Sequence, residues 1–159
     1  MNSLFAKTLT AWYQKNARDL PWRRTKDPYK IWISEVMLQQ TTVNAVIPYF
    51  EKWIKTFPTI DDLAKTPIQT VLAQWQGLGY YNRAKNLHRS AQIIVNEHDA
   101  QVPSDPEVVR RLPGFGPYTT GAVLSIAYNR KLPIIDANVR RVVMRILSID
   151  GAADTKQDK

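Results

Sequence analysis

The chain of 159 residues contains 22 lysines and arginines against 14 aspartates and glutamates, which gives a formal net charge of +8. A hydrophobic content of 44% is typical of a globular protein and excludes a largely disordered chain, and the excess of cations favours a polyanionic partner. The lack of cysteine excludes disulfides and thiolate-bound metals, and the sequence predicts neither a membrane span nor a secretory signal.

Helical periodicity begins near the amino terminus and continues along the chain. The apolar residues at positions 4, 5, 9, 12 and 13 predict a first amphipathic helix. After a loop with two prolines, a second helix is predicted over residues 29–40, and Pro48 either kinks a third helix or begins one that ends before Pro58. Further helices are predicted over residues 60–65, 68–75 and 82–97. Because little alternation indicates strands, the predicted class is all-α.

Residues 112–141 form the most informative segment, and they begin with the sequence LPGFGP. Gly114 and Gly116 allow positive φ and a close approach to another molecule. Pro117 fits the first turn of a helix, whose unpaired N–H groups can hold a phosphate. A further helix is predicted to begin at Asp136. Alone, the glycine hairpin is more often a helical corner with a glycine C-cap, and the helix start at Asp136 is more often a plain aspartate N-cap. Together, the two features favour a site that holds a phosphate beside a carboxylate.

Two carboxyl groups are predicted to lie in opposite environments. Glu35 shares a helix face with Ile31 and Leu38, so burial should raise its pKa and keep it protonated near neutral pH. Asp136 at a helix start would accept backbone N–H bonds and meet the positive end of the helix dipole, which favours the ionised form. The alternatives are a surface glutamate and a plain N-cap.

The LPGFG segment and Asp136 together resemble the helix-hairpin-helix DNA glycosylase superfamily, which includes enzymes like endonuclease III. Within it, residues 34–41, SEVMLQQT, and residues 77–81, GLGYY, look like the adenine DNA glycosylases that act on mispaired adenine. The motifs stand in the expected order, and the resemblance runs from about residue 12 to residue 149. It implies the all-α fold of that superfamily, with a helical lobe and an incomplete second lobe.

The resemblance implies a DNA repair enzyme that hydrolyses the N-glycosidic bond of adenine mispaired with 8-oxoguanine or guanine in double-stranded DNA. Glu35 would protonate the flipped adenine, and Asp136 would stabilise the positive charge on the sugar. Asn138 would orient Asp136 or contact the DNA backbone. Tyr118 would position the reacting nucleotide, and it stands where bifunctional relatives place a Schiff-base lysine. This difference predicts a monofunctional enzyme without lyase activity.

The resemblance also assigns contacts with DNA. Gln40 would enter the base stack with Thr41 beside it, and Tyr80 would wedge against the opposite strand. The alternatives are a polar helix end and a half-buried aromatic in a turn. The adenine pocket or its rim would be lined by Arg18, Leu20, Trp22 and Arg23, of which Trp22 fits a core position equally well. Phosphates would be held around the hairpin and the following helix by Gly114, Phe115, Gly116 and Arg140.

The predicted organisation has four segments. Residues 1–28 form an N-terminal helix and pocket loop, residues 29–132 the helical lobe with the hairpin, residues 133–150 the helix of the catalytic aspartate, and residues 151–159 a disordered tail. Most relatives of this type bind a [4Fe–4S] cluster through cysteines beyond this point. We therefore expect no metal or cofactor in this chain, and a cluster only in a longer form. The polar ending favours a truncated chain of marginal stability, with an apolar patch around Trp12.

Two other functions are compatible with the sequence. The chain could be a catalytically weak DNA-binding fragment that keeps the hairpin and the basic face. It could also be a thymine or uracil mismatch glycosylase, because those enzymes share the hairpin and the aspartate. In each case we expect a monomer without a membrane partner, located in the cytoplasm and associated with the nucleoid in a bacterium.

Overall fold

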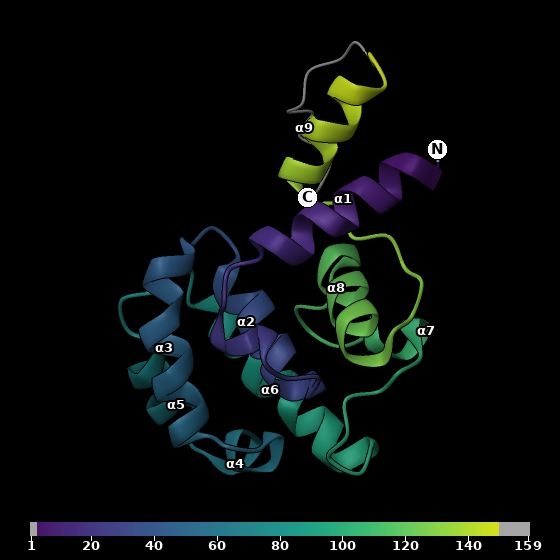
Figure 1. The fold of residues 1–159 in the computed structure, drawn as a ribbon. Coiled ribbons are helices and arrows are strands. Elements are labelled where there is room, and N and C mark those ends of the chain that lie inside the picture. The colour runs from purple at the N-terminus through teal and green to yellow at the C-terminus, as the bar shows by residue number, and fades with distance from the viewer. Residues whose placement is uncertain (1–2, 150–159) are drawn as a thin grey trace.

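Helices are the only regular elements of residues 3–149, the part of the chain that the computed structural model describes (Figure 1). This confirms the all-α prediction. The elements in chain order are α1 (Ser3–Asn16), the short 3-10 helix η1 (Pro21–Arg23), α2 (Pro28–Leu38), α3 (Val43–Thr56), α4 (Ile60–Lys65), α5 (Ile68–Trp75), α6 (Asn82–Glu97), α7 (Pro106–Val109), α8 (Pro117–Tyr128) and α9 (Ala137–Ile146).

Local sequence signals set most of these boundaries. The Asp27 side chain accepts a hydrogen bond from the Tyr29 N–H and, with Pro28 in the first turn, begins α2. Thr59 and Asp62 form a reciprocal capping box that begins α4. The predicted bounds of α4, α5 and α6 are confirmed. Helix α2 ends two residues earlier than predicted, because the backbone leaves the helical region after Leu38.

The structure decides between the two interpretations of Pro48. This proline lies inside α3, which begins at Val43, so it does not begin a helix. It lacks the N–H that would bond to the carbonyl one turn earlier. The short elements η1 and α7 were not predicted, because three or four residues carry too little periodicity to be recognised.

The core forms around α2, which packs against α3 on one side and α8 on the other. Helices α4 and α5 pack against α6, as Figure 1 shows. The rings of Trp53 and Trp75 meet edge to face with centroids 5.5 Å apart, and both side chains are fully buried. The Trp53 Nε1–H donates to the Tyr29 hydroxyl at 3.3 Å, so the buried polar atoms there are satisfied.

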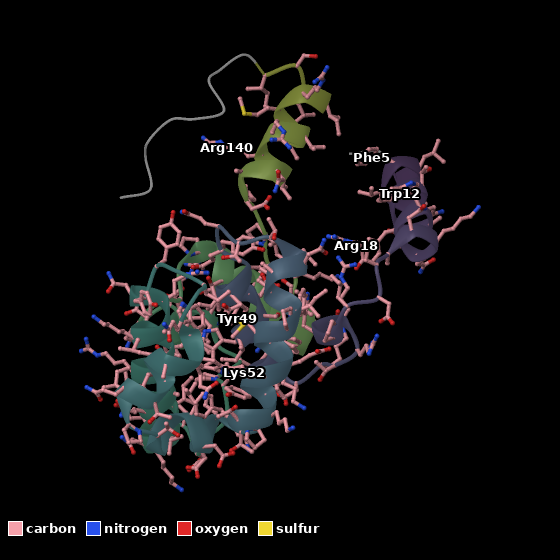
Figure 2. All side chains as sticks on the ribbon, turned by 90° about the vertical axis from the view of Figure 1, so that its left-hand side faces the viewer. Phe5, Trp12, Arg18, Tyr49, Lys52 and Arg140 are labelled. Atoms are coloured by element: carbon pink, nitrogen blue, oxygen red, sulfur yellow. The ribbon has the colours of Figure 1, made fainter. Side chains whose placement is uncertain are left out.

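Helices α1 and α9 project from this core (Figure 2). Leu4 on α1 is 68% exposed and Trp12 is 61% exposed, which confirms the apolar patch expected around Trp12. Helix α9 has no buried residue. Both helices therefore present apolar side chains that the rest of residues 3–149 does not cover. The tail predicted for residues 151–159 lies outside the described residues.

Candidate active site

Glu35 and Tyr118 form the centre of the site. Glu35 lies in the last two turns of α2 and is only 8% exposed. Tyr118 lies in the first turn of α8, and its hydroxyl donates a 2.9 Å hydrogen bond to Glu35 Oε2. The packing of α2 against α8 brings these residues together although they are far apart in the sequence. The predicted burial of Glu35 is confirmed.

The surroundings of Glu35 act on its ionisation in opposite directions. Burial raises the pKa of Glu35, because the charged form loses hydration, and the charge of Asp136 raises it further. The hydrogen bond from Tyr118 lowers the pKa, but burial is the largest effect and the net direction is upward. Burial and the Glu35 charge also raise the pKa of Tyr118, which keeps its phenol protonated as a donor.

Asp136 is the N-cap of α9, as predicted. Its Oδ1 accepts a 2.7 Å bond from the Val139 N–H, and its Oδ2 accepts a 3.2 Å bond from the Asn138 amide. The Asn138 side-chain Oδ1 in turn accepts a hydrogen bond from Arg141 Nη2 at 3.1 Å. Asn138 therefore orients Asp136, which was one of its two predicted roles. Asp136 is half-buried, and its charge is close enough to Glu35 to act on the pKa of that residue.

The segment before Asp136 crosses α8 in close contact. A Cβ atom on Gly121 would lie 2.3 Å from the Pro133 carbonyl oxygen, so only glycine allows this approach. The Ser125 hydroxyl donates to the Leu132 carbonyl at 3.3 Å and holds the same segment. Helix α8 thus carries Tyr118 and also fixes the path of the chain that leads to Asp136. A cavity of about 110 Å³ lies here, lined by Arg110, Pro117, Tyr118, Thr120, Gly121, Leu132, Pro133 and Ile135.

The hairpin before α8 is held against α6, and its glycines remain exposed to solvent. Gly114 has a φ of +82°, and a Cβ atom there would lie 3.0 Å from Cβ of Asn86 on α6. The Ser90 hydroxyl of the same helix donates to the Pro113 carbonyl at 2.7 Å. Gly116 caps α8 without a side-chain acceptor, so the first N–H groups of α8 remain open to an anion.

The side chain of Phe115 has a different role from the one predicted. It is 4% exposed and stacks on Trp32 with ring centroids 5.0 Å apart. The backbone N–H of Phe115 also donates a hydrogen bond to the Leu112 carbonyl at 3.1 Å. Phe115 therefore anchors the hairpin to α2, and burying a ring of this size stabilises the structure by about 2 kcal/mol. It is not available for DNA, whereas the flanking glycines are exposed.

Two of the residues predicted to open the duplex, Gln40 and Tyr80, line one pocket. Gln40 follows α2 and is exposed, and Tyr80 precedes α6 and is 64% exposed. Thr41 is half-buried, and its hydroxyl donates to the Gln39 carbonyl at 3.3 Å. The pocket has a volume of about 350 Å³ and is lined by Gln39, Gln40, Tyr80, Tyr81, Asn82 and Arg83.

The four residues predicted at the adenine pocket or its rim divide into two pairs. Leu20 and Trp22 are buried, and the Trp22 ring meets Phe50 edge to face at 5.4 Å, so Trp22 occupies a core position. Arg18 and Arg23 are exposed. The Arg23 guanidinium donates to the Arg18 carbonyl at 3.1 Å. These two arginines are the members of the set that remain accessible to a ligand.

Arg140 lies on the projecting helix α9 and is exposed (Figure 2). Its side chain is open to a phosphate, which is compatible with the predicted contact. No group of three histidine, aspartate or glutamate side chains within residues 3–149 is arranged to hold a metal ion. Without cysteine, the residues of this chain do not fit an iron–sulfur cluster. Within the same range, no helix combines the length and the apolar content that a bilayer crossing requires.

Comparison with known proteins identifies the family. Residues 33–158 match the family described as HhH-GPD superfamily base excision DNA repair protein. The chain belongs to this superfamily. Its fold agrees with that of a thermostable thymine-DNA glycosylase, with a TM-score of 0.82 and 33% identity over 88% of this chain and 65% of that structure.

Curated relatives within the superfamily are adenine DNA glycosylases. The protein of that name from Buchnera aphidicola (Acyrthosiphon pisum) is 46% identical over 97% of this chain and 44% of its own length. The one from Mycobacterium tuberculosis is 44% identical over 92% of this chain and 48% of its own length. The chain therefore spans less than half the length of these relatives.

Proposed function

We propose that the chain is the catalytic core of a DNA glycosylase that removes adenine mispaired with 8-oxoguanine or guanine. The observation that carries this proposal is the buried Glu35, hydrogen-bonded to Tyr118 and within the electrostatic reach of Asp136. Hydrolysis of a base–sugar bond needs both a proton donor and a negative charge near the sugar. The similarity to proteins named adenine DNA glycosylase supports adenine as the base.

The two carboxyl groups divide the chemistry of bond cleavage. Glu35, whose pKa is raised by burial, donates a proton to the imidazole ring of the flipped adenine. The bond between C1′ and the base then breaks, and its electron pair leaves with the adenine. Asp136 stabilises the resulting oxocarbenium-like sugar. Water adds to C1′ and returns a proton to Glu35, so the product is an abasic site and free adenine.

Two surfaces of the described structure support binding and opening of the duplex. The exposed glycines of the hairpin and the open N–H groups of α8 suit a phosphate close to the carboxyl pair. Gln40 and Tyr80 border one pocket and suit insertion where a base has left the stack. Unstacking costs a few kcal/mol, and a mispair lowers that cost.

We propose further that the enzyme is monofunctional. The Tyr118 hydroxyl is hydrogen-bonded to Glu35 in the site, and a phenol cannot form the imine that a lyase mechanism needs. Borohydride reduction during turnover on mispaired DNA should therefore yield little covalent protein–DNA complex. Efficient trapping at a lysine of this chain would contradict the monofunctional assignment.

Single-turnover assays on a panel of mispairs test the proposed substrate. We expect abasic sites from A:8-oxoguanine and A:G duplexes and none from T:G or U:G duplexes. Thymine release would favour the mismatch glycosylase that the similarity to thymine-DNA glycosylase suggests. Duplex binding without release of any base would favour a DNA-binding fragment.

A further inference from the structure

Arg83 joins the two loops that border the Gln40 and Tyr80 pocket. It lies in the first turn of α6, and its Nη1 donates to the carbonyls that end α2, those of Val36 at 2.8 Å, Met37 at 3.0 Å and Gln39 at 2.7 Å. Its Nη2 donates to carbonyls of the turn before α6, those of Leu78 at 3.0 Å and Gly79 at 3.3 Å. One planar guanidinium therefore fixes the distance between two loops that are far apart in the sequence.

Each loop presents its exposed residue directly after a carbonyl that Arg83 holds. Gln40 follows Gln39 and has a φ of +54°, and Tyr80 follows Gly79 and has a φ of +46°. A residue other than glycine adopts this left-handed conformation only where its surroundings impose it. The Arg83 guanidinium also stacks near the Tyr80 ring, 5.6 Å from its centroid. Arg83 therefore holds the carbonyl directly before each of these two residues.

The environment of Arg83 differs from that of an exposed arginine that contacts phosphates. Its side chain is half-buried, and its guanidinium lies 5.2 Å from the centroid of the Trp75 ring on the side of the core. Both terminal nitrogens already donate to carbonyls. The Nη1 contacts also satisfy carbonyls at the end of α2 that have no partner within the helix. The charge is therefore directed into the protein and not toward DNA.

We propose that Arg83 is a positioning residue that holds Gln40 and Tyr80 at a fixed separation, so that both enter the duplex together when the target base leaves it. This inference rests on the proposed function, because it needs a substrate whose base must be extruded. Arg83 would act on the extrusion step and not on bond cleavage. Its loss should therefore slow removal of a stacked adenine more than removal of one that is already unpaired.

The test compares Arg83→Lys and Arg83→Met with Arg89→Met, which removes an exposed charge from the same helix. Melting curves first define a temperature at which all variants are folded. Base release is then measured in single turnovers on two duplexes, one with adenine opposite 8-oxoguanine and one with adenine opposite an abasic site. Fluorescence of 2-aminopurine in place of the adenine reports extrusion directly.

We expect both Arg83 variants to slow extrusion and release from the mispaired duplex by about tenfold or more, because a lysine ammonium cannot bridge both loops. On the unpaired adenine, the deficit should shrink to about threefold or less, and Arg89→Met should match the wild type on both duplexes. Wild-type extrusion by Arg83→Lys, or an equal deficit on both duplexes, would overturn the proposal. Absence of base release by the wild type would instead contradict the proposed function.

Discussion

The Tyr118 hydroxyl lies 2.9 Å from Glu35 Oε2, so the first turn of α8 is hydrogen-bonded to the buried end of α2. This bond opposes the effect of burial, because it favours the ionised form of Glu35. The balance between the two effects sets the pH range in which Glu35 can act as an acid.

Replacing Tyr118 with phenylalanine should raise the pKa of Glu35. The substitution removes the one hydrogen bond that lowers this pKa and leaves the burial unchanged. A ¹³C NMR titration of the labelled Glu35 carboxyl group measures the shift directly. A pKa that stays the same or falls in Tyr118→Phe would show that the hydrogen bond does not act on Glu35 in solution.

Replacing Glu35 with glutamine should change how stability depends on pH. The folded-state pKa of Glu35 lies above the ordinary value of 4.5, so the folded protein keeps a proton that the unfolded chain loses first. The contribution of Glu35 to stability is therefore complete below pH 4.5 and is lost as pH rises to the raised value. Because glutamine does not titrate, Glu35→Gln should gain stability relative to the wild type across that window.

Urea denaturation midpoints of both proteins, measured at intervals from about pH 4 to about pH 8, give the comparison. The difference in midpoint should grow with pH and then level off. A constant difference over the whole range would mean that Glu35 has the same pKa in the folded and unfolded states.

Asp136→Asn and Asp136→Ala separate the catalytic and structural roles of this residue. Both should lose base release, because neither carries the negative charge that the sugar needs. Only alanine should shorten α9, since asparagine still caps a helix and loss of a cap costs about 1 kcal/mol. Helix α9 buries no residue, so the change should be seen in far-UV circular dichroism and not in the melting temperature. Near-wild-type release by Asp136→Asn would contradict the catalytic role.

Gly121→Ala should displace the segment that leads to Asp136. The added Cβ atom would lie 2.3 Å from the Pro133 carbonyl oxygen, a backbone atom, and such overpacking costs about 1–3 kcal/mol. Base release should fall as well, because this segment positions Asp136. Gly116→Ala is the control for stability alone, because its φ is −73° and a Cβ atom there would meet nothing within 4 Å. Equal denaturation midpoints for the two variants would show that the contact at Gly121 is not tight.

Local sequence signals predicted where helices begin and end more successfully than they predicted the contacts between helices. Proline and capping residues mark the start of α2 and α4, and helical periodicity was sufficient for α6. Phe115 illustrates the limit. Its place between two glycines suggested a contact with DNA, but the ring packs against Trp32, which lies far away in the sequence. Burial of a side chain at a turn depends on tertiary packing that no local pattern contains.

The residues of the site could be predicted from the sequence, but the hydrogen bonds that join them could not. The apolar face around Glu35 and the cap at Asp136 are local features, and both are confirmed. The bond from Tyr118 to Glu35 depends on how α8 packs against α2, which the spacing of residues does not encode. Arg83 follows the GLGYY segment closely in the sequence, yet its five carbonyl partners come from two separate places, the end of α2 and the turn before α6.

The most direct test of the central claim is adenine release by Glu35→Gln in single turnovers on an A:8-oxoguanine duplex, with binding to the same duplex measured in parallel. An amide has nearly the shape of the carboxyl group but cannot donate its proton. We expect the variant to bind the duplex as the wild type does and to release no adenine. Release at the wild-type rate would show that the buried carboxyl group is not the acid.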